Sequence, residues 1–181
     1  MEQLSEKIIE TLNKNSTINF LNAARQLINL LEDDSIQKDV FCGESHICLA
    51  ELYRTALYLE PVDLIYSKVE DEFTGISNEH LRKININLIS KLGQECLYWK
   101  VFDPTLSKKN EPVQRWLVDD FADIYAELKE ELIKIDRIKT NQSIEDALWQ
   151  LKFGFNHHWG NRCSDGIRAL HYLWYQGKVV M

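Results

Sequence analysis

The sequence contains little glycine and proline, and it has no long run of apolar residues. Its 181 residues include 7 Gly and 3 Pro, too few for the dense turns of a β-sandwich or for a disordered chain. No segment approaches the roughly 20 apolar residues of a membrane-spanning helix. The first residues alternate charged with apolar side chains and lack the apolar core of a secretion signal. We therefore expect a soluble, cytoplasmic protein that is not associated with membranes.

Clustered basic charge is missing as well. The formal net charge is -7, and a surface that binds nucleic-acid phosphates needs grouped Lys and Arg side chains. We therefore expect no nucleic-acid partner. The sequence also lacks a phosphate-binding glycine-rich loop, an H-E-x-x-H zinc motif and a G-x-S-x-G nucleophile elbow. These absences disfavour the familiar enzyme classes.

The four cysteines form no C-x-x-C pair. The simplest interpretation is reduced thiols that are mostly buried. Cys42, His46 and Cys48 lie close enough in sequence to ligate zinc in principle, but their spacing matches no established zinc motif. We expect no bound metal and no cofactor.

Apolar residues recur at helical spacing along most of the chain, which predicts an all-α fold. A chain of this length can bury a core of its own, so we expect a single helical domain over residues 1–181, a bundle of about six or seven helices. The clearest stripes are Phe20, Ala24, Leu27, Ile28 and Leu31, and then Leu117, Phe121, Ile124, Leu128, Leu132 and Ile135.

Two segments before the second stripe are ambiguous. In residues 84–88 apolar and polar side chains alternate, as they do in a strand. We nevertheless predict a helix, because no second strand is evident to pair with these residues. After the aromatic run 96–102, residues 103–111 are predicted to be a polar loop, and Pro112 suits the first turn of a helix.

The last helical pattern begins near Ser143, which with Asp146 resembles a capping box. It continues to Gln176 as one helix or as two, and the strongest signal for a break is Trp159-Gly160-Asn161.

A polar cluster interrupts the apolar stripes of the last two long helices. Arg162 falls on the apolar face of the final pattern, with His158 and Asp165 at its edge, provided that the helix is continuous. On the preceding helix Asp120 and Asp123 belong to an acidic stripe that begins beside Trp116 and reaches Glu127. A short connection favours antiparallel neighbours, so these carboxylates are expected to meet His158 and Arg162.

Several interpretations of this cluster stay open. A buried polar network can fix the register of two helices and do nothing else. Alternatively, Arg162 can grip an anionic group with two hydrogen bonds, carboxylates with His158 can hold a metal, or His158 can act in acid–base chemistry. His171 lies on the far side of the helix from Arg162, where a half-buried His bonded to a carbonyl is the more common arrangement.

Residues 98–173 resemble the bacterial family of domains of unknown function DUF5063. The likeness rests on Tyr98-Trp99 to Pro104, the run D-D-F-A-D-I-Y at 119–125, Trp149, H-W-G at 158–160 and R-A-L-H at 168–171. The resemblance implies a helical fold and a bacterial origin, and it implies no activity. At the position where the family commonly has a second His, this chain has Arg162, whose guanidinium offers no lone pair to a metal. The family motif positions are Asp119, Asp120, Asp123, His158, Trp159 and His171.

Together these patterns favour a non-enzymatic interaction or regulatory module with a protein partner, which we expect to bind an exposed apolar patch on the early helices. The alternative is a small-ligand or metal-binding protein, or an uncharacterised enzyme, with its site between the last two long helices. That site would take a small anionic molecule, and its candidate residues are Asp119, Asp120, Asp123, His158, Arg162, Asp165 and His171.

Overall fold

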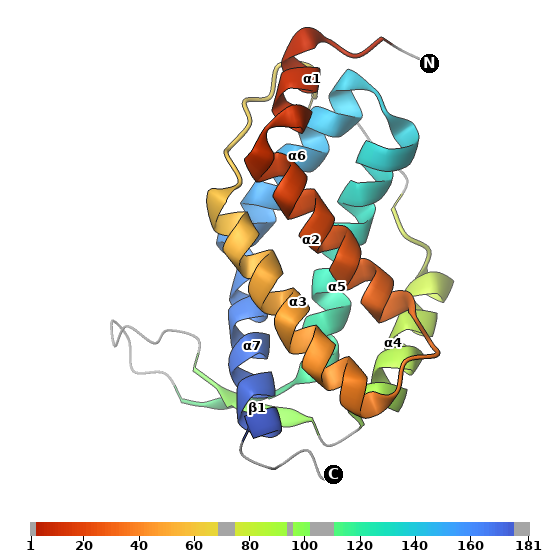
Figure 1. The fold of residues 1–181 in the computed structure, drawn as a ribbon, viewed down its shortest axis with the longest axis vertical. Helices are drawn as coiled ribbons and strands as arrows, with labels where there is room; N and C mark the ends of the chain where they lie inside the picture. The colour runs from red at the N-terminus through yellow and green to blue at the C-terminus, as the bar shows by residue number, and fades with distance from the viewer. Residues whose placement is uncertain (1–2, 69–74, 94–95, 102–110, 176–181) are drawn as a thin grey trace.

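The computed structural model describes residues 3–68, 75–93, 96–101 and 111–175. This part of the chain contains seven α-helices and one two-stranded hairpin (Figure 1). The predicted all-α fold with six or seven helices is confirmed. In chain order the elements are α1 (Glu6–Asn13), α2 (Asn15–Glu32), α3 (Lys38–Tyr58), α4 (Asn78–Leu92), β1 (Leu97–Lys100), β2 (Val113–Trp116), α5 (Leu117–Ile133), a π-helical turn (Lys134–Ile138), α6 (Asn141–His157) and α7 (Trp159–Tyr175).

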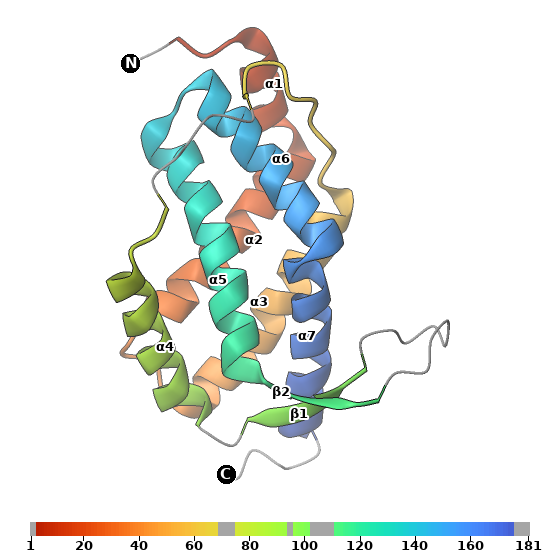
Figure 2. The same cartoon turned by 180° about the vertical axis from the view of Figure 1, so that it is seen from behind.

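The helices form an elongated bundle with the hairpin across one end. Helix α3 packs against α2 and α7, and α5 packs against α4, α6 and α7. Seen from behind, α5 and α7 run side by side, and the hairpin crosses the end where α5 starts and α7 finishes (Figure 2). The hairpin therefore lies beside the helices that carry the candidate polar residues.

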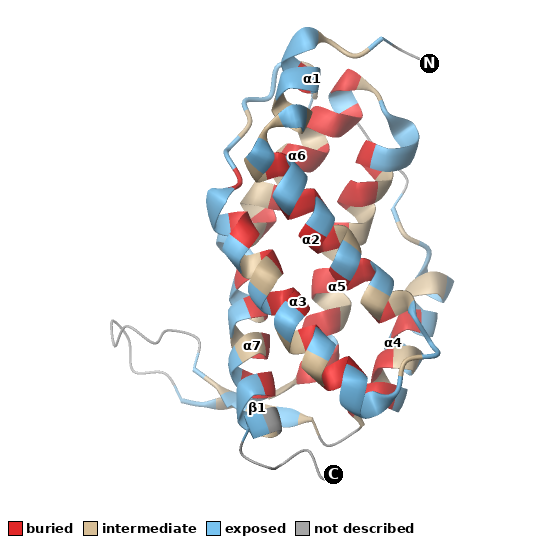
Figure 3. Cartoon of the chain, in the orientation of Figure 1, coloured by how far each residue is buried: buried red, intermediate tan, exposed pale blue. Residues whose placement is uncertain are grey.

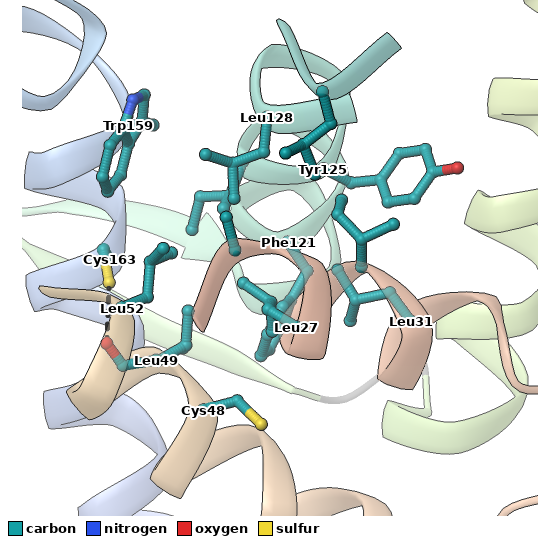
Figure 4. Packing of buried hydrophobic residues seen from close by; sticks show 14 of the residues in the cluster. Leu27, Leu31, Cys48, Leu49, Leu52, Phe121, Tyr125, Leu128, Trp159 and Cys163 are labelled. Atoms are coloured by element: carbon teal, nitrogen blue, oxygen red, sulfur yellow. Dashed lines mark hydrogen bonds between the residues drawn. The ribbon is translucent and has the colours of Figure 1, made fainter. Parts of the chain in front are cut away.

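The core follows the apolar stripes of the sequence. Every residue of the two predicted stripes, in α2 and in α5 with the turn after it, is buried (Figure 3). Side chains of α2, α3, α5 and α7 meet in one cluster, in which the Cys163 thiol donates a hydrogen bond to the Leu49 carbonyl (Figure 4). All four cysteines are free, and three of them are buried.

The final helical pattern is broken, and the break lies at His158. This residue leaves helical geometry, with φ -127° and ψ -89°, while its N–H still donates to the Gly154 carbonyl at 2.8 Å. A Cβ at Gly160 would clash with the Phe155 carbonyl oxygen. Glycine is therefore required where α7 starts so close to the end of α6.

The hairpin was not predicted. Residues 97–100 and 113–116 pair as antiparallel strands, with Tyr98 opposite Arg115 and Trp99 opposite Gln114. The expectation of a helix starting at Pro112 is therefore wrong, because α5 begins at Leu117. The predicted loop at 103–111 lies almost wholly outside the described residues. Residues 84–88 are helical as predicted, within α4.

One predicted helix start is displaced by a few residues. Helix α6 is capped by Thr140 rather than Ser143, which occupies the third helical position and completes a capping box with Thr140. At the start of α4, the Ser77 hydroxyl accepts a hydrogen bond from the His80 N–H.

Candidate functional site

Five side chains join the hairpin to α5 and α7, and we call them the Asp120 network: Tyr98, Arg115, Asp120, Asp123 and Arg162. The carboxylate of Asp120 accepts from the Tyr98 hydroxyl at 2.6 Å and from the Arg115 guanidinium at 3.2 Å. Arg162 lies 3.4 Å from Asp120 and 2.7 Å from Asp123. One carboxylate thus connects both strands of the hairpin to two helices.

Asp120 is the buried centre of this network. It is 1% exposed and lies in the first turn of α5, where the helix dipole favours negative charge. Burying an unpaired carboxylate costs several kcal/mol, and here two guanidinium groups and a hydroxyl compensate for the lost water. Burial, reinforced by the hydrogen bond to Asp120, raises the pKa of Tyr98, so its phenol stays a donor.

Two further contacts hold the hairpin against α7. The Lys100 ammonium lies 2.5 Å from the Asp165 carboxylate. The Arg168 guanidinium donates to the Trp99 carbonyl at 3.1 Å. Because Tyr98 and Lys100 are two residues apart on β1, they point to the same side of the strand, and their partners show that this side faces the bundle.

The structure divides the candidate residues that the sequence grouped together. Asp120, Asp123 and Arg162 come together, whereas Asp119 is exposed on the same helical turn. Burial raises the pKa of Asp123, and Arg162 partly opposes this shift.

His158 and His171 lie apart from the Asp120 network. The break before α7 turns the exposed His158 toward Glu127, with 3.7 Å between Nδ1 and Oε2. His171 is exposed and packs edge-on against His46, with 5.9 Å between ring centroids.

Next to the Asp120 network lies an apolar groove of about 430 Å³, which we call the hairpin groove. Its floor comes from the end of α7 and its wall from β1. Trp99 at its rim is 63% exposed. In the sequence, the dense aromatic run after Cys96 was the signal for this groove. The lining residues are Leu97, Tyr98, Trp99, Arg168, Ala169, Tyr172 and Leu173.

Metal ligation finds little support in the described residues. No group of three or more His, Cys, Asp or Glu side chains in this part of the chain is arranged to hold a metal ion. The hypothetical zinc ligands Cys42 and Cys48 are buried within α3, and burial raises the pKa of both thiols to about 11.

A second buried charge cluster joins α5, the π-helical turn and α6. The Lys134 ammonium lies 2.9 Å from Glu131 and 2.7 Å from Asp146. One ammonium group thus lies between two acidic side chains. Burial raises the pKa of Glu131 to about 8, although the positive charge of Lys134 opposes this shift.

This arrangement predicts a pH-dependent stability. Between the unfolded value of 4.5 and the folded value of about 8 the native state holds a proton on Glu131 that the unfolded chain has lost. The free energy of unfolding should therefore fall as pH rises through this window, and Glu131→Gln should flatten the fall. Urea unfolding at about pH 5 and about pH 8 measures both slopes. Parallel slopes for the two proteins would show that Glu131 is not the titrating group.

Sequence reasoning missed Glu145 altogether. This residue of α6 is buried, and its Oε2 accepts from the backbone N–H groups of Ile65, Tyr66 and Ser67 at 2.7, 2.6 and 2.8 Å. A carboxylate with three backbone donors fixes the connection that follows α3. No local pattern signals it, because the partners are 78 to 80 residues away in sequence.

The fold and the site define a class of protein: a helical bundle in which a short hairpin is fixed across one end by a buried carboxylate. The chain belongs to the family described as domain of unknown function DUF5063, whose model matches residues 11–176. It is similar in structure to protein BF1032 from Bacteroides fragilis, with a TM-score of 0.76 and 22% sequence identity over 94% of this chain and 99% of the other. That likeness shows the fold. No curated protein matches the chain.

None of the helices in the described residues combines the length and the apolar character needed to cross a membrane.

Proposed function

We propose that this chain is a non-enzymatic, cytoplasmic interaction module that binds a segment of a partner protein in the hairpin groove. The observation that carries the proposal is the exposed Trp99 at the rim of an apolar groove of about 430 Å³. Exposed apolar surface that gathers around a groove is typical of binding sites, and Trp is enriched among the residues that dominate binding energy.

Neighbouring side chains extend this surface. Leu97 and Val101 on the hairpin side and Tyr172 and Tyr175 on α7 are all exposed. Exposed apolar residues also occur on α1, α2 and α3, where the sequence led us to expect a patch; they are Ile9, Ile18, Val40, Ile47, Leu57 and Tyr58. The hairpin end is favoured because there the exposed aromatic residues border an apolar hollow.

The charge at the groove indicates what binds there. Arg168 is the charged residue of its lining, and it uses one N–H on the Trp99 carbonyl. Among the described residues no carboxylate pairs with Arg168, and a guanidinium has five N–H donors. We therefore commit to an apolar partner segment that carries an Asp or Glu side chain to pair with Arg168.

The Asp120 network supports this function indirectly. Its carboxylate already accepts from Tyr98, Arg115 and Arg162. The alternative of a small anionic ligand there is less favoured, because Arg162 is already paired with two aspartates. The network serves instead to hold β1, and with it the wall of the groove, in a fixed position.

A peptide-display selection tests the proposal. Random peptides of about 12 residues, long enough to span such a groove, are selected on the full chain, and their affinities are measured by fluorescence anisotropy. We expect enriched peptides that combine apolar residues with a carboxylate. Trp99→Ala and Arg168→Glu should each weaken binding at least about ten-fold. The control Tyr58→Ala removes an equally exposed aromatic side chain from α3 and should leave the affinity unchanged.

Three outcomes contradict the proposal. Peptides that bind Trp99→Ala as tightly as the unchanged protein would place the binding surface elsewhere. Enriched peptides without carboxylates, insensitive to Arg168→Glu, would refute the proposed charge pairing. A concentration-dependent dimer that Trp99→Ala abolishes, together with no peptide enrichment, would show that a second copy of this chain fills the groove.

A further inference from the structure

A separate pocket of about 440 Å³ lies between α5 and α6, beside the break before α7. It shares no lining residue with the hairpin groove. Helix α5 contributes three carboxyl groups, those of Glu127, Glu130 and Glu131. The opposite wall includes Phe153 and, at the junction of α6 and α7, His158. The pocket is therefore acidic on one side and aromatic on the other.

Trp159 provides a buried donor without an acceptor in this pocket. It is 1% exposed, it lines the pocket, and its Nε1–H has no hydrogen-bond partner in the described part of the chain. Leaving a buried donor unpaired costs about 1–3 kcal/mol. An oxygen atom that accepts from this N–H would recover that energy.

Glycine at position 154 lets the donor and a carboxylate approach helix α6 closely. A Cβ at Gly154 would lie 2.9 Å from the Trp159 Nε1 and 2.9 Å from the Glu127 Oε2. Both polar atoms thus lie close to the same backbone position, because glycine leaves room for them there. A ligand in the adjoining pocket, which both residues line, can reach a hydrogen-bond donor and a carboxylate at the same time.

The carboxylates of the pocket have little positive charge to balance them. Lys134 is shared between Glu131 and Asp146. The Glu127 carboxylate lies 3.7 Å from Nδ1 of His158, an imidazole that carries positive charge only when it is protonated. Burial raises the pKa of Glu127 even though His158 and Arg162 oppose the shift. A cation placed between Glu127 and Glu130 would stabilise their charged forms.

We propose that this pocket binds a small protonated amine that also carries a hydroxyl group, a compound of the amino-alcohol class. The ammonium group lies against Glu127 and Glu130, the hydroxyl oxygen accepts from Trp159 Nε1, and the carbon chain packs on Phe153. Anionic molecules are disfavoured by the carboxylates of Glu127 and Glu130. The ligand charge is thus opposite to the one that Arg162 suggested from sequence alone.

Titration of the full chain with ethanolamine, followed by the indole N–H signals in two-dimensional NMR, tests the proposal. We expect saturable binding that shifts one indole signal. That signal is assigned to Trp159 by exclusion, since Trp99→Phe, Trp116→Phe, Trp149→Phe and Trp174→Phe each remove another. Propylamine lacks the oxygen and glycolate carries the opposite charge, so both should bind at least about ten-fold more weakly.

Variants of the pocket complete the test. Glu127→Gln removes one charge partner and should weaken ethanolamine binding about ten-fold, whereas Glu79→Gln, on the exposed face of α4, should not. Gly154→Ala would displace the Trp159 indole and the Glu127 carboxylate, and should abolish binding. If Gly154→Ala does not fold, the affinity of Glu127→Gln for ethanolamine still tests the proposal. Propylamine binding as tightly as ethanolamine without an indole shift, equal binding of glycolate, or no loss on Glu127→Gln would each overturn the proposal.

Discussion

Replacing Asp120 with alanine is expected to lower the free energy of unfolding by about 3–5 kcal/mol. The substitution removes the acceptor shared by Tyr98, Arg115 and Arg162. Two guanidinium groups, each only partly exposed, would then face each other without the carboxylate between them. Urea unfolding followed by far-UV circular dichroism measures the loss.

Asp119→Ala is the matched control for this prediction. Asp119 is the preceding residue on α5, but it is exposed and its side chain makes no hydrogen bond or ion pair in the described part of the chain. Its removal costs its interaction with the helix dipole, about 0.3–1 kcal/mol, and a longer-range attraction to Arg115 that its repulsion of Asp123 offsets. If Asp119→Ala and Asp120→Ala destabilised the protein equally, the carboxylate of Asp120 would not be the centre of the network.

Glu145→Ala is expected to cost about 3 kcal/mol, because three partly buried backbone N–H groups lose a charged acceptor at once. Besides lowering the stability of the whole protein, the substitution should loosen the segment that Glu145 holds. Residues Ile65 to Ser67 are held to α6 through this carboxylate. We therefore expect limited proteolysis to cut within residues 59–68 in the variant and to spare these residues in the unchanged protein.

Glu60→Ala is the control for Glu145→Ala. Glu60 lies in the same connection and pairs with Lys14 at 2.7 Å, but both side chains are exposed. Exposed ion pairs contribute about 0–1 kcal/mol. An equal loss of stability in the two variants, or an uncut connection in Glu145→Ala, would contradict the anchoring role of Glu145.

The helices could be predicted from the sequence because their stability depends on a repeating apolar face. Leu117 to Ile135 carries an apolar residue at nearly every turn, and each of these residues is buried. The signal is local and needs no knowledge of the partner helix. The helix over 84–88 was predicted on a different ground, the lack of a second strand to pair with these residues, and they do lie within α4.

The hairpin was not predicted because its polar residues face the bundle and its apolar residues face outward, the reverse of the usual arrangement. The side of the strands that faces the bundle carries Tyr98, Lys100 and Arg115, which pair with acidic groups, whereas Leu97 and Trp99 are exposed. A rule that places polar residues outside and apolar residues inside fails for such a strand. The aromatic composition of residues 97–99 was the one local signal of a strand.

The polar cluster was predicted only in part, for a geometric reason. The helical wheel joined His158 to Arg162 on the assumption of a continuous helix. The break at His158 shifts the phase, so Arg162 reaches Asp120 and Asp123 while His158 turns toward Glu127. The contacts of Glu145 and the pocket at Trp159 join segments far apart in the sequence, and no local pattern contains them.

Hydrogen exchange of the hairpin amides is the most direct test of the central claim, that the Asp120 network fixes the hairpin and so shapes the groove. Exchange is compared between the unchanged protein and Asp120→Asn, with amides of α2 as the internal reference. We expect faster exchange in β1 and β2 of the variant and unchanged exchange in α2. Unchanged exchange in the hairpin, or equal acceleration in the hairpin and α2, would contradict the account.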